Sequence, residues 1–157
     1  MKLLKFSMLP VLGVCLLLFS CTSTKTPRDL GTSTGMKVSP VVGATGVKSA
    51  SQLVDFFMSR NPQGDREQVA RLANYYVKEA ATEGINSDVA FVQMCLETGF
   101  LRFGGLVTPE MNNFCGLGAI DESQRGEWFP SEEIGIRAHI QHLHAYGTTG
   151  ELKGTLV

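Results

Sequence analysis

Apolar residues recur at helical spacing between about residues 50 and 147 and predict several helices. The first is a short helix after Ser51, which we expect to be its N-cap. A second helix begins at Asp65, where Gln68 three residues later fits a capping box, and it ends near Gly84. The apolar positions of this second helix are Val69, Leu72, Tyr76 and Ala80.

The next helix is apolar on most of its faces, which predicts a buried central helix. It starts at Ser87 or Asp88 and ends at Glu97. Residues 100–130 lose the periodicity and contain many Gly, Asn and aromatic residues, which predicts loops and a short hairpin. A last helix follows, with Ser131 as its N-cap. The pattern predicts a mainly α domain (α+β) with a loop or short-hairpin insert after its central buried helix.

The first 20 residues have a basic start, an apolar run and a small residue at its end, which is typical of a secretory signal. The run is too short and broken to span a bilayer, since a spanning helix needs about 20 apolar residues. Residues 18–21 (LFSC) resemble the bacterial lipobox, in which the Cys carries diacylglycerol and becomes the new N-terminus. Acylation of Cys21 would anchor the protein to a membrane of the cell envelope, on its periplasmic or surface side. An ordinary signal with an incidental Cys is the alternative.

Composition divides the rest of the chain. Residues 21–49 are rich in Thr, Ser, Gly and Pro, which predicts a flexible tether after the signal at 1–20. Residues 50–147 are enough for one small core, and the polar residues 148–157 are expected to be a short tail.

The net charge limits the kinds of partner that the protein is expected to bind. The net charge is −1 and no basic run follows the signal, which excludes nucleic acid and an electrostatic membrane contact.

Of the four cysteines, Cys95 and Cys115 fall in the folded part. They could pair in an oxidising compartment or be two small buried residues, since bridging requires Cα atoms within about 7 Å.

Glu97 is unusual because it ends an apolar helix. A helix C-terminus carries partial negative charge, and Phe100, Leu101 and Phe103 follow directly. Both features favour a protonated carboxyl group. A glycosidase needs such a group to protonate the leaving oxygen. The alternative is an exposed Glu at a helix end with no special role.

Three segments carry motifs in a set order. Residues 95–100 (CLETGF) resemble the helix-end ETG motif of the lysozyme-like peptidoglycan hydrolases. Residues 112–118 (NNFCGLG) resemble the NNxxGi segment of their glucosaminidase family, of the glycoside hydrolase family 73 type. Residues 129–139 (FPSEEIGIRAH) resemble the helix opening of that family. Together, over residues 65–147, the three motifs are specific.

The resemblance implies a lysozyme-like fold with a groove between the helical lobe and the insert. It implies an endo-β-N-acetylglucosaminidase that cuts peptidoglycan glycan strands with Glu97 as general acid. Asn112, Asn113 and Phe114 would shape the groove, and amides suit sugar hydroxyl or acetamido groups, although Asn also favours turns. Peptidoglycan is then the partner, no cofactor is required, and a monomer is expected.

The sequence leaves the identity of the second catalytic group open. Asp121, Glu122 and Glu127 lie in the insert, and each could face Glu97 as a second carboxylate or belong to a solvated loop. The substrate's own 2-acetamido group could also act as the nucleophile.

A tryptophan and two histidines also lie in or near the motifs. Trp128 is the aromatic residue that we expect as a sugar platform. His139 and His142 lie three apart on one helix, but neither Cys nor carboxylate accompanies them at a metal-site spacing. No metal site is expected, and His139 is expected near the groove or a helix interface.

Two other functions remain. Members of the family often continue beyond the last helix, so this domain could bind glycan and cut weakly or not at all. It could also be a lysozyme or lytic transglycosylase, which cuts after N-acetylmuramic acid.

Overall fold

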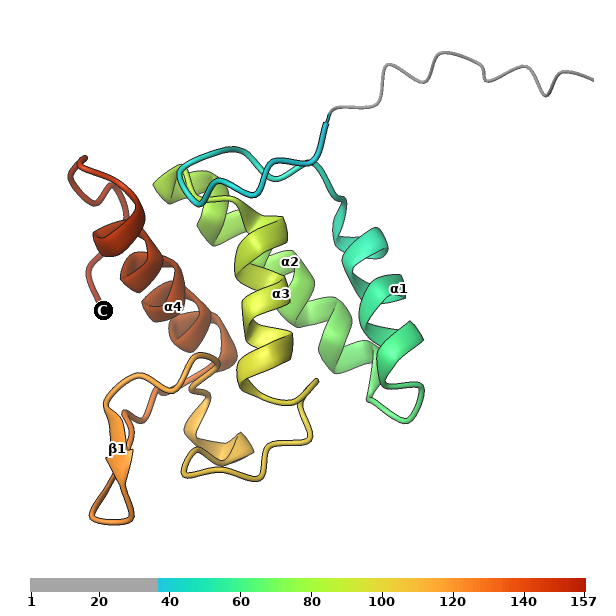
Figure 1. Ribbon diagram of the computed structural model, residues 1–157, viewed down its shortest axis with the longest axis vertical. Coiled ribbons are helices and arrows are strands. Elements are labelled where there is room, and N and C mark those ends of the chain that lie inside the picture. Colours follow the sequence, from blue (N-terminus) through green and yellow to red (C-terminus); the bar gives the residue numbers. More distant parts are fainter. Residues whose placement is uncertain (1–36) are drawn as a thin grey trace, which may run out of the picture. The chain divides into compact units, whose positions relative to one another are not determined.

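The computed structural model describes residues 37–157 (Figure 1). The predicted signal, Cys21 and the first part of the predicted tether lie outside the described residues. The elements are α1 (Ala50–Arg60), α2 (Arg66–Glu83), α3 (Ser87–Glu97), the 3-10 turn η1 (Pro109–Met111), β1 (Ala119–Asp121), β2 (Gln124–Arg125) and α4 (Glu132–Gly147). The mainly α prediction, with loops and a hairpin between α3 and α4, is confirmed.

Helix α1 begins two residues earlier than the sequence suggested. Its N-cap is Ser49, whose hydroxyl accepts a hydrogen bond from the backbone N–H of Gln52 at 3.3 Å. The Gln52 side chain accepts one in return from Ser49 N–H at 3.0 Å. The prediction of Ser51 as the N-cap is wrong, because Gln52 lies at the position that completes a capping box only with Ser49.

The predicted caps of α2 and α4 are confirmed. Asp65 accepts hydrogen bonds from two N–H groups of the first turn of α2, and Gly84 ends the helix with φ +73°. Gln68 does not close a capping box, because its amide donates to Glu132 at 3.0 Å and joins α2 to α4. Ser131 caps α4.

Helix α2 is the centre of the bundle, and it contacts α1, α3 and α4. The largest fully buried side chains are Phe57, Leu72, Tyr76, Ile85, Phe91, Met94, Met111, Ile136 and Ile140. Helix α3 is less buried than its apolar composition predicts, since Val92 is 38% exposed and Leu96 is 69% exposed. One face of α3 packs on α2, and another faces solvent.

Residues 37–49 are packed against the bundle, although the sequence placed them in the tether. The Asp88 carboxylate at the start of α3 accepts hydrogen bonds from Val47 N–H and Lys48 N–H, both at 3.0 Å. Asn86 donates its side-chain amide to Ser39 O and its backbone N–H to Val42 O, both at 2.8 Å. These bonds use backbone groups, which leave no trace in the pattern of apolar residues.

The segment 148–157 is also held in place. The Glu83 carboxylate accepts hydrogen bonds from the N–H groups of Lys153 and Gly154, both at 2.9 Å. The Gln141 side chain donates to Thr155 O at 2.8 Å and accepts from Val157 N–H at 3.1 Å. The predicted tail has no helix or strand, but it is part of the folded domain.

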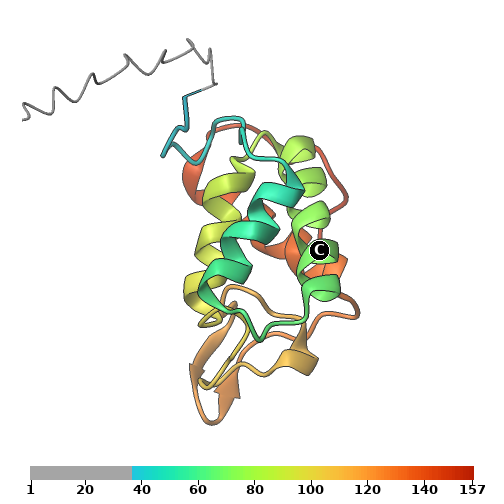
Figure 2. The same ribbon diagram turned by 90° about the vertical axis from the view of Figure 1, so that its right-hand side faces the viewer.

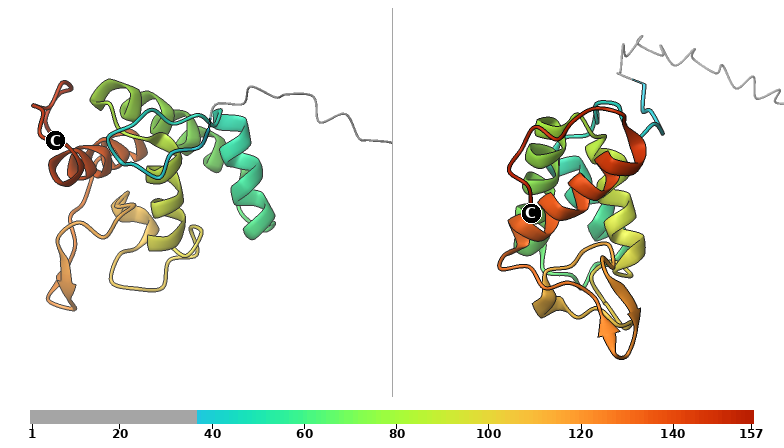
Figure 3. Two further views of the ribbon diagram at one scale, coloured as in Figure 1. Left: turned by 45° about the horizontal axis from the view of Figure 1, so that its top comes forward. Right: turned by 90° about the vertical axis from the view of Figure 1, so that its left-hand side faces the viewer.

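The insert between α3 and α4 gathers at the end of the bundle where α3 ends and α4 begins (Figures 2 and 3). Strands β1 and β2 form an antiparallel hairpin that pairs Ala119 with Arg125. The insert also lies against the start of α4, because a Cβ on Gly135 would lie 1.7 Å from Asn112 O. Among residues 37–157, no helix is both long and apolar enough to cross a membrane.

Candidate active site

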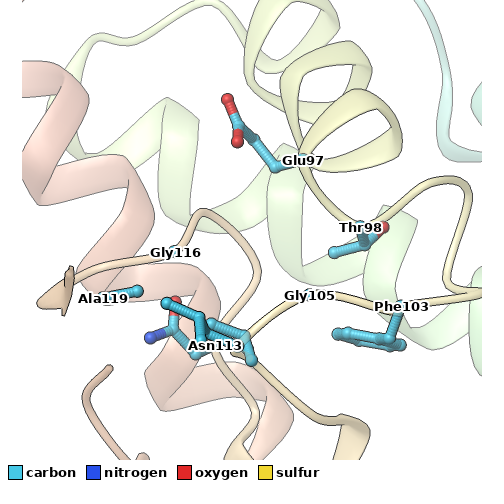
Figure 4. A pocket seen from close by; sticks show the side chains of 9 residues that line it. Glu97, Thr98, Phe103, Gly105, Asn113, Gly116 and Ala119 are labelled. Carbon is cyan, nitrogen blue, oxygen red and sulfur yellow. The ribbon is translucent and has the colours of Figure 1, made fainter. Parts of the chain in front are cut away.

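A pocket of about 200 Å³ lies where α3 ends (Figure 4). Its lining residues are Glu97, Thr98, Phe103, Gly105, Leu106, Val107, Asn113, Gly116 and Ala119. Most of this wall is apolar or backbone, and Glu97 is the charged side chain in it. Figure 4 shows Glu97 across the pocket from Asn113, Gly116 and Ala119.

A tight left-handed turn fixes Glu97 as the last residue of α3. Gly99, Phe100 and Leu101 each have φ of +58°, a conformation that side-chain-bearing residues rarely adopt. The buried Thr98 stabilises the turn, since its hydroxyl donates to Met94 O at 2.7 Å and accepts from Leu101 N–H at 3.0 Å. Backbone strain of this kind persists where the surrounding structure determines it, and it is common at functional sites.

Glu97 is exposed, although the apolar residues that follow it in the sequence predicted apolar surroundings. Phe100 turns away and packs against Phe56 and Phe57, with ring centroids 6.1 and 5.6 Å away. Leu101 also packs on the core, which leaves Phe103 as the aromatic residue in the pocket. Within residues 37–157, the Glu97 carboxylate has neither a hydrogen-bond nor an ion-pair partner, so both oxygens are free for a ligand.

Asn113 organises the opposite wall of the pocket. Its amide N–H groups donate to Leu117 O at 2.9 Å and Glu127 O at 3.1 Å. Its amide oxygen accepts from Leu117 N–H at 3.0 Å and from Cys115 N–H at 3.4 Å. The side chain is 1% exposed and its hydrogen-bonding groups are occupied by backbone. It therefore shapes the wall rather than offering free donors to a sugar.

The neighbours of Asn113 also have packing roles. Asn112 has φ +50° and donates its amide to Phe129 O at 3.0 Å, which holds the insert to the segment before α4. Phe114 is 2% exposed and belongs to the core, so it has no face for substrate. Trp128 is 66% exposed on the insert but does not line the pocket.

The acidic side chains of the hairpin lie outside this pocket. Asp121 accepts three hydrogen bonds from Ser123 and Gln124 and so forms the hairpin turn. The Glu122 side chain is 83% exposed and lies 3.9 Å from Arg125. Glu127 lines a different cavity. In the structure of residues 37–157, none of these three carboxylates shares the pocket with Glu97.

The two cysteines of the folded part are unpaired. Cys95 is buried and Cys115 is half-buried, and burial raises the pKa of each thiol to about 12. Thiols with such pKa values are poor nucleophiles at neutral pH. Of the two alternatives left open by the sequence, the structure shows two unpaired cysteines and no disulfide between them.

The histidines of α4 have separate surroundings. His139 is fully buried against Tyr76 of α2. The ring of His142 packs on Tyr146, and the buried His144 lies 3.7 Å from the Glu83 carboxylate. Groups of three or more metal-binding side chains are absent from the part of the chain that the structure describes.

Sequence reasoning missed much of the pocket wall. Leu106 and Val107 gave no signal, because their contribution depends on how the loop after α3 folds back, whereas Thr98 stands inside the ETG motif. Gly105 and Gly116 could have been found, since Gly105 stands in a glycine pair after the first motif and Gly116 stands inside the second motif.

The sequence is similar to known proteins over the residues that form this site. Residues 73–155 match the glucosaminidase family, described as mannosyl-glycoprotein endo-beta-N-acetylglucosaminidase. An uncharacterized protein of Borreliella burgdorferi is 38% identical over 121 residues. That match covers 77% of this chain and 59% of the relative, so the chain spans less than two thirds of the relative's length. No solved structure matches. The family match includes α3, the insert, α4 and most of the segment 148–157, and the chain belongs to the glucosaminidase family.

Proposed function

We propose that this protein is a peptidoglycan hydrolase, an endo-β-N-acetylglucosaminidase with Glu97 as general acid. The main support for this proposal is the position of Glu97. It is the charged side chain in a mostly apolar pocket, and a tight turn fixes it at the end of α3. It also lies within the residues that match the family. In this role, the protonated carboxyl group donates its proton to the oxygen of the leaving sugar as the glycosidic bond breaks. The apolar wall with Phe103 suits the apolar face of a pyranose ring.

The pocket favours help from the substrate in breaking the bond: the acetamido oxygen would bond to the anomeric carbon as the leaving oxygen takes the proton of Glu97, and water would then open the resulting oxazoline. Glycosidases that lack a second carboxylate can use the 2-acetamido group of the substrate as nucleophile. Here the hairpin carboxylates lie outside the pocket, so the acetamido route needs no movement of the protein. The other route requires Glu122 or Glu127 to reach the glycan as the hairpin moves. Replacing each by Gln separates the routes, because only the second route loses cleavage.

The same observation favours one alternative function. A domain with one carboxylate in its pocket could bind glycan strands and cut them slowly or not at all. Exposed Trp128 would serve either role as a platform for a sugar ring.

Product analysis distinguishes these functions. Purified peptidoglycan is incubated with the protein, and the released fragments are reduced and analysed by mass spectrometry. Fragments ending in reduced N-acetylglucosamine support the proposal. Fragments ending in N-acetylmuramic acid, reduced or anhydro, indicate a lysozyme or lytic transglycosylase. Retention of the protein on sacculi without released fragments indicates a glycan-binding protein.

We also propose export and lipidation at Cys21, from the signal-like residues 1–20 and the lipobox-like residues 18–21. Membrane fractionation of cells and the mass of the mature N-terminal peptide test this proposal. Cys21→Ala should release the protein from the membrane fraction. A mature chain that still begins at Met1 would contradict it.

A further inference from the structure

A second cavity of about 460 Å³ lies beside α4 and is larger than the pocket at Glu97. Its lining residues are Leu117, Glu127 and Phe129 of the insert, Ala138, Gln141, His142 and Ala145 of α4, and Leu152, Leu156 and Val157 of the C-terminal segment. Three parts of the chain that are distant in sequence therefore meet here.

Buried polar groups fix the C-terminal wall of this cavity. Glu83 and Gln141 are 3% and 6% exposed, and both hold the segment 148–157 through its backbone. That segment places three apolar side chains on the cavity. The wall is a built part of the fold, and it lies within the family match as far as residue 155.

One loop contributes residues to both cavities. Gly116 and Ala119 line the pocket at Glu97, whereas Leu117, between them in sequence, lines the second cavity. Asn113 lines the first pocket and binds Leu117 and Glu127, which line the second, through their backbone groups.

The chemistry of the second cavity differs from that of a sugar site. Its lining is mostly apolar and includes the ring of His142 and one carboxylate, that of the exposed Glu127, which lies over Gly118 and has no ion pair within residues 37–157. The Gln141 amide already forms hydrogen bonds with the C-terminal segment. The cavity therefore fits a ligand with small apolar groups and one cationic amine, rather than a ring rich in hydroxyl groups.

Peptidoglycan carries such a ligand on every second sugar. Its peptide arm contains alanyl methyl groups and a diamino residue, whose side-chain amine is free wherever the arm is not cross-linked. We infer that the second cavity binds this peptide arm, with its methyl groups against the apolar wall and its amine at Glu127. The inference rests on the proposed peptidoglycan substrate, and it adds the peptide to the features that the protein recognises.

Direct binding tests the inference without requiring cleavage. The probe is the pentapeptide L-alanyl-γ-D-glutamyl-L-lysyl-D-alanyl-D-alanine, titrated into the whole protein and followed by NMR shifts of α4 and residues 148–157. We expect Glu127→Gln and acetylation of the lysyl amine each to weaken binding by up to about fivefold, the size of an exposed ion pair. Ala145→Phe, which fills part of the cavity from an exposed position, should weaken it further. Glu67→Gln is the matched control, since it removes the same charge from an exposed site at the start of α2.

Activity supplies a second readout. The wild type should cut intact peptidoglycan faster than glycan strands from which an amidase has removed the peptides. Ala145→Phe should reduce that difference and keep the rate on peptide-free strands. Equal loss on both substrates in Ala145→Phe would show that this cavity serves cleavage itself and would overturn the inference, as would pentapeptide binding that is absent or insensitive to both cavity variants. Failure of Glu97→Gln to stop cleavage would instead contradict the catalytic assignment, since peptide binding does not depend on Glu97.

Discussion

The Nδ1 atom of His139 lies 2.8 Å from the hydroxyl oxygen of Tyr76, and this contact joins α4 to α2 inside the core. The two rings meet edge to face with centroids 5.7 Å apart. The other ring nitrogen of His139, Nε2, is buried without a hydrogen-bond partner among the described residues. Burial, with a smaller contribution from His142, lowers the pKa of His139 to about 3.

This lowered pKa predicts a loss of stability in mild acid. The unfolded chain takes up a proton on His139 below its ordinary pKa of 6.5, whereas the folded protein does so only near 3. The contribution to stability is therefore complete above about pH 6.5 and falls as the pH decreases from 6.5 towards 3. The slope from this one group is at most about 1.4 kcal/mol per pH unit. Urea unfolding between pH 7.5 and 4.5 measures it.

His139→Gln is the matched variant for this pH series. Its amide can still meet the Tyr76 hydroxyl, but it does not titrate. We expect the variant to be less stable at pH 7.5, because the ring packing is lost, and to depend less on pH below 6.5. Identical pH dependence in both proteins would show that His139 is not kept neutral by folding.

Glu97→Gln should remove cleavage and leave the fold intact. The amide keeps the shape of the side chain but cannot donate a catalytic proton, so cleavage of peptidoglycan should fall by at least about 100-fold. Because Glu97 is exposed and unpartnered in the described structure, the free energy of unfolding should change by less than about 0.5 kcal/mol. Release of soluble fragments and a melting curve measure the two effects. A variant that retains full activity would place the acid elsewhere.

Asn113→Ala should damage both stability and the pocket. The substitution removes four hydrogen bonds and leaves backbone groups of Leu117 and Glu127 without those partners. We expect a loss of about 2–4 kcal/mol in the free energy of unfolding, together with weaker cleavage. Asn112→Ala, which loses the one hydrogen bond to Phe129 O, should cost about 1 kcal/mol. Equal melting temperatures for the two variants would contradict the organising role of Asn113.

The helices were predictable because their signals are local. Asp65, Ser131 and Gly84 act within one turn of the residues that they cap, and the apolar spacing between them marks the buried face. The packed ends of the domain were not predictable in this way. Residues 37–49 and 148–157 are fixed by side chains of Asp88, Glu83 and Gln141, which are distant in sequence.

The site was predictable only in part, for the same reason. Glu97 stands out from its place at the end of a helix, and it does line a pocket. Its surroundings could not be read from sequence neighbours, because the turn at Gly99 directs Phe100 into the core and leaves Glu97 exposed. Asn113 was predicted to contact the sugar, but its hydrogen-bond partners lie in the backbone of its own loop and of residue 127.

The carboxylate of Glu83 connects the end of α2 to the C-terminal segment. Burial alone would raise its pKa, but hydrogen bonds from Lys153 N–H and Gly154 N–H, with contributions from Gln141 and His144, outweigh burial and lower it below the ordinary 4.5. A lowered pKa means that this contribution to stability is complete above about pH 4.5 and is lost as the pH falls further. The hydrogen bonds that hold the C-terminal segment should therefore weaken as the pH falls below about 4.5.

Glu83→Gln should loosen the C-terminal segment at neutral pH. Each carboxylate oxygen accepts one N–H group, and Gln replaces one of these oxygens by an amide that points its own N–H at a backbone donor. We expect faster hydrogen exchange at Lys153 and Gly154, by about tenfold or more for a loss of 1.4 kcal/mol. Glu151→Gln is the control, because Glu151 is exposed in the same segment. Unchanged exchange in Glu83→Gln would mean that the Gln141 contacts hold the segment without Glu83.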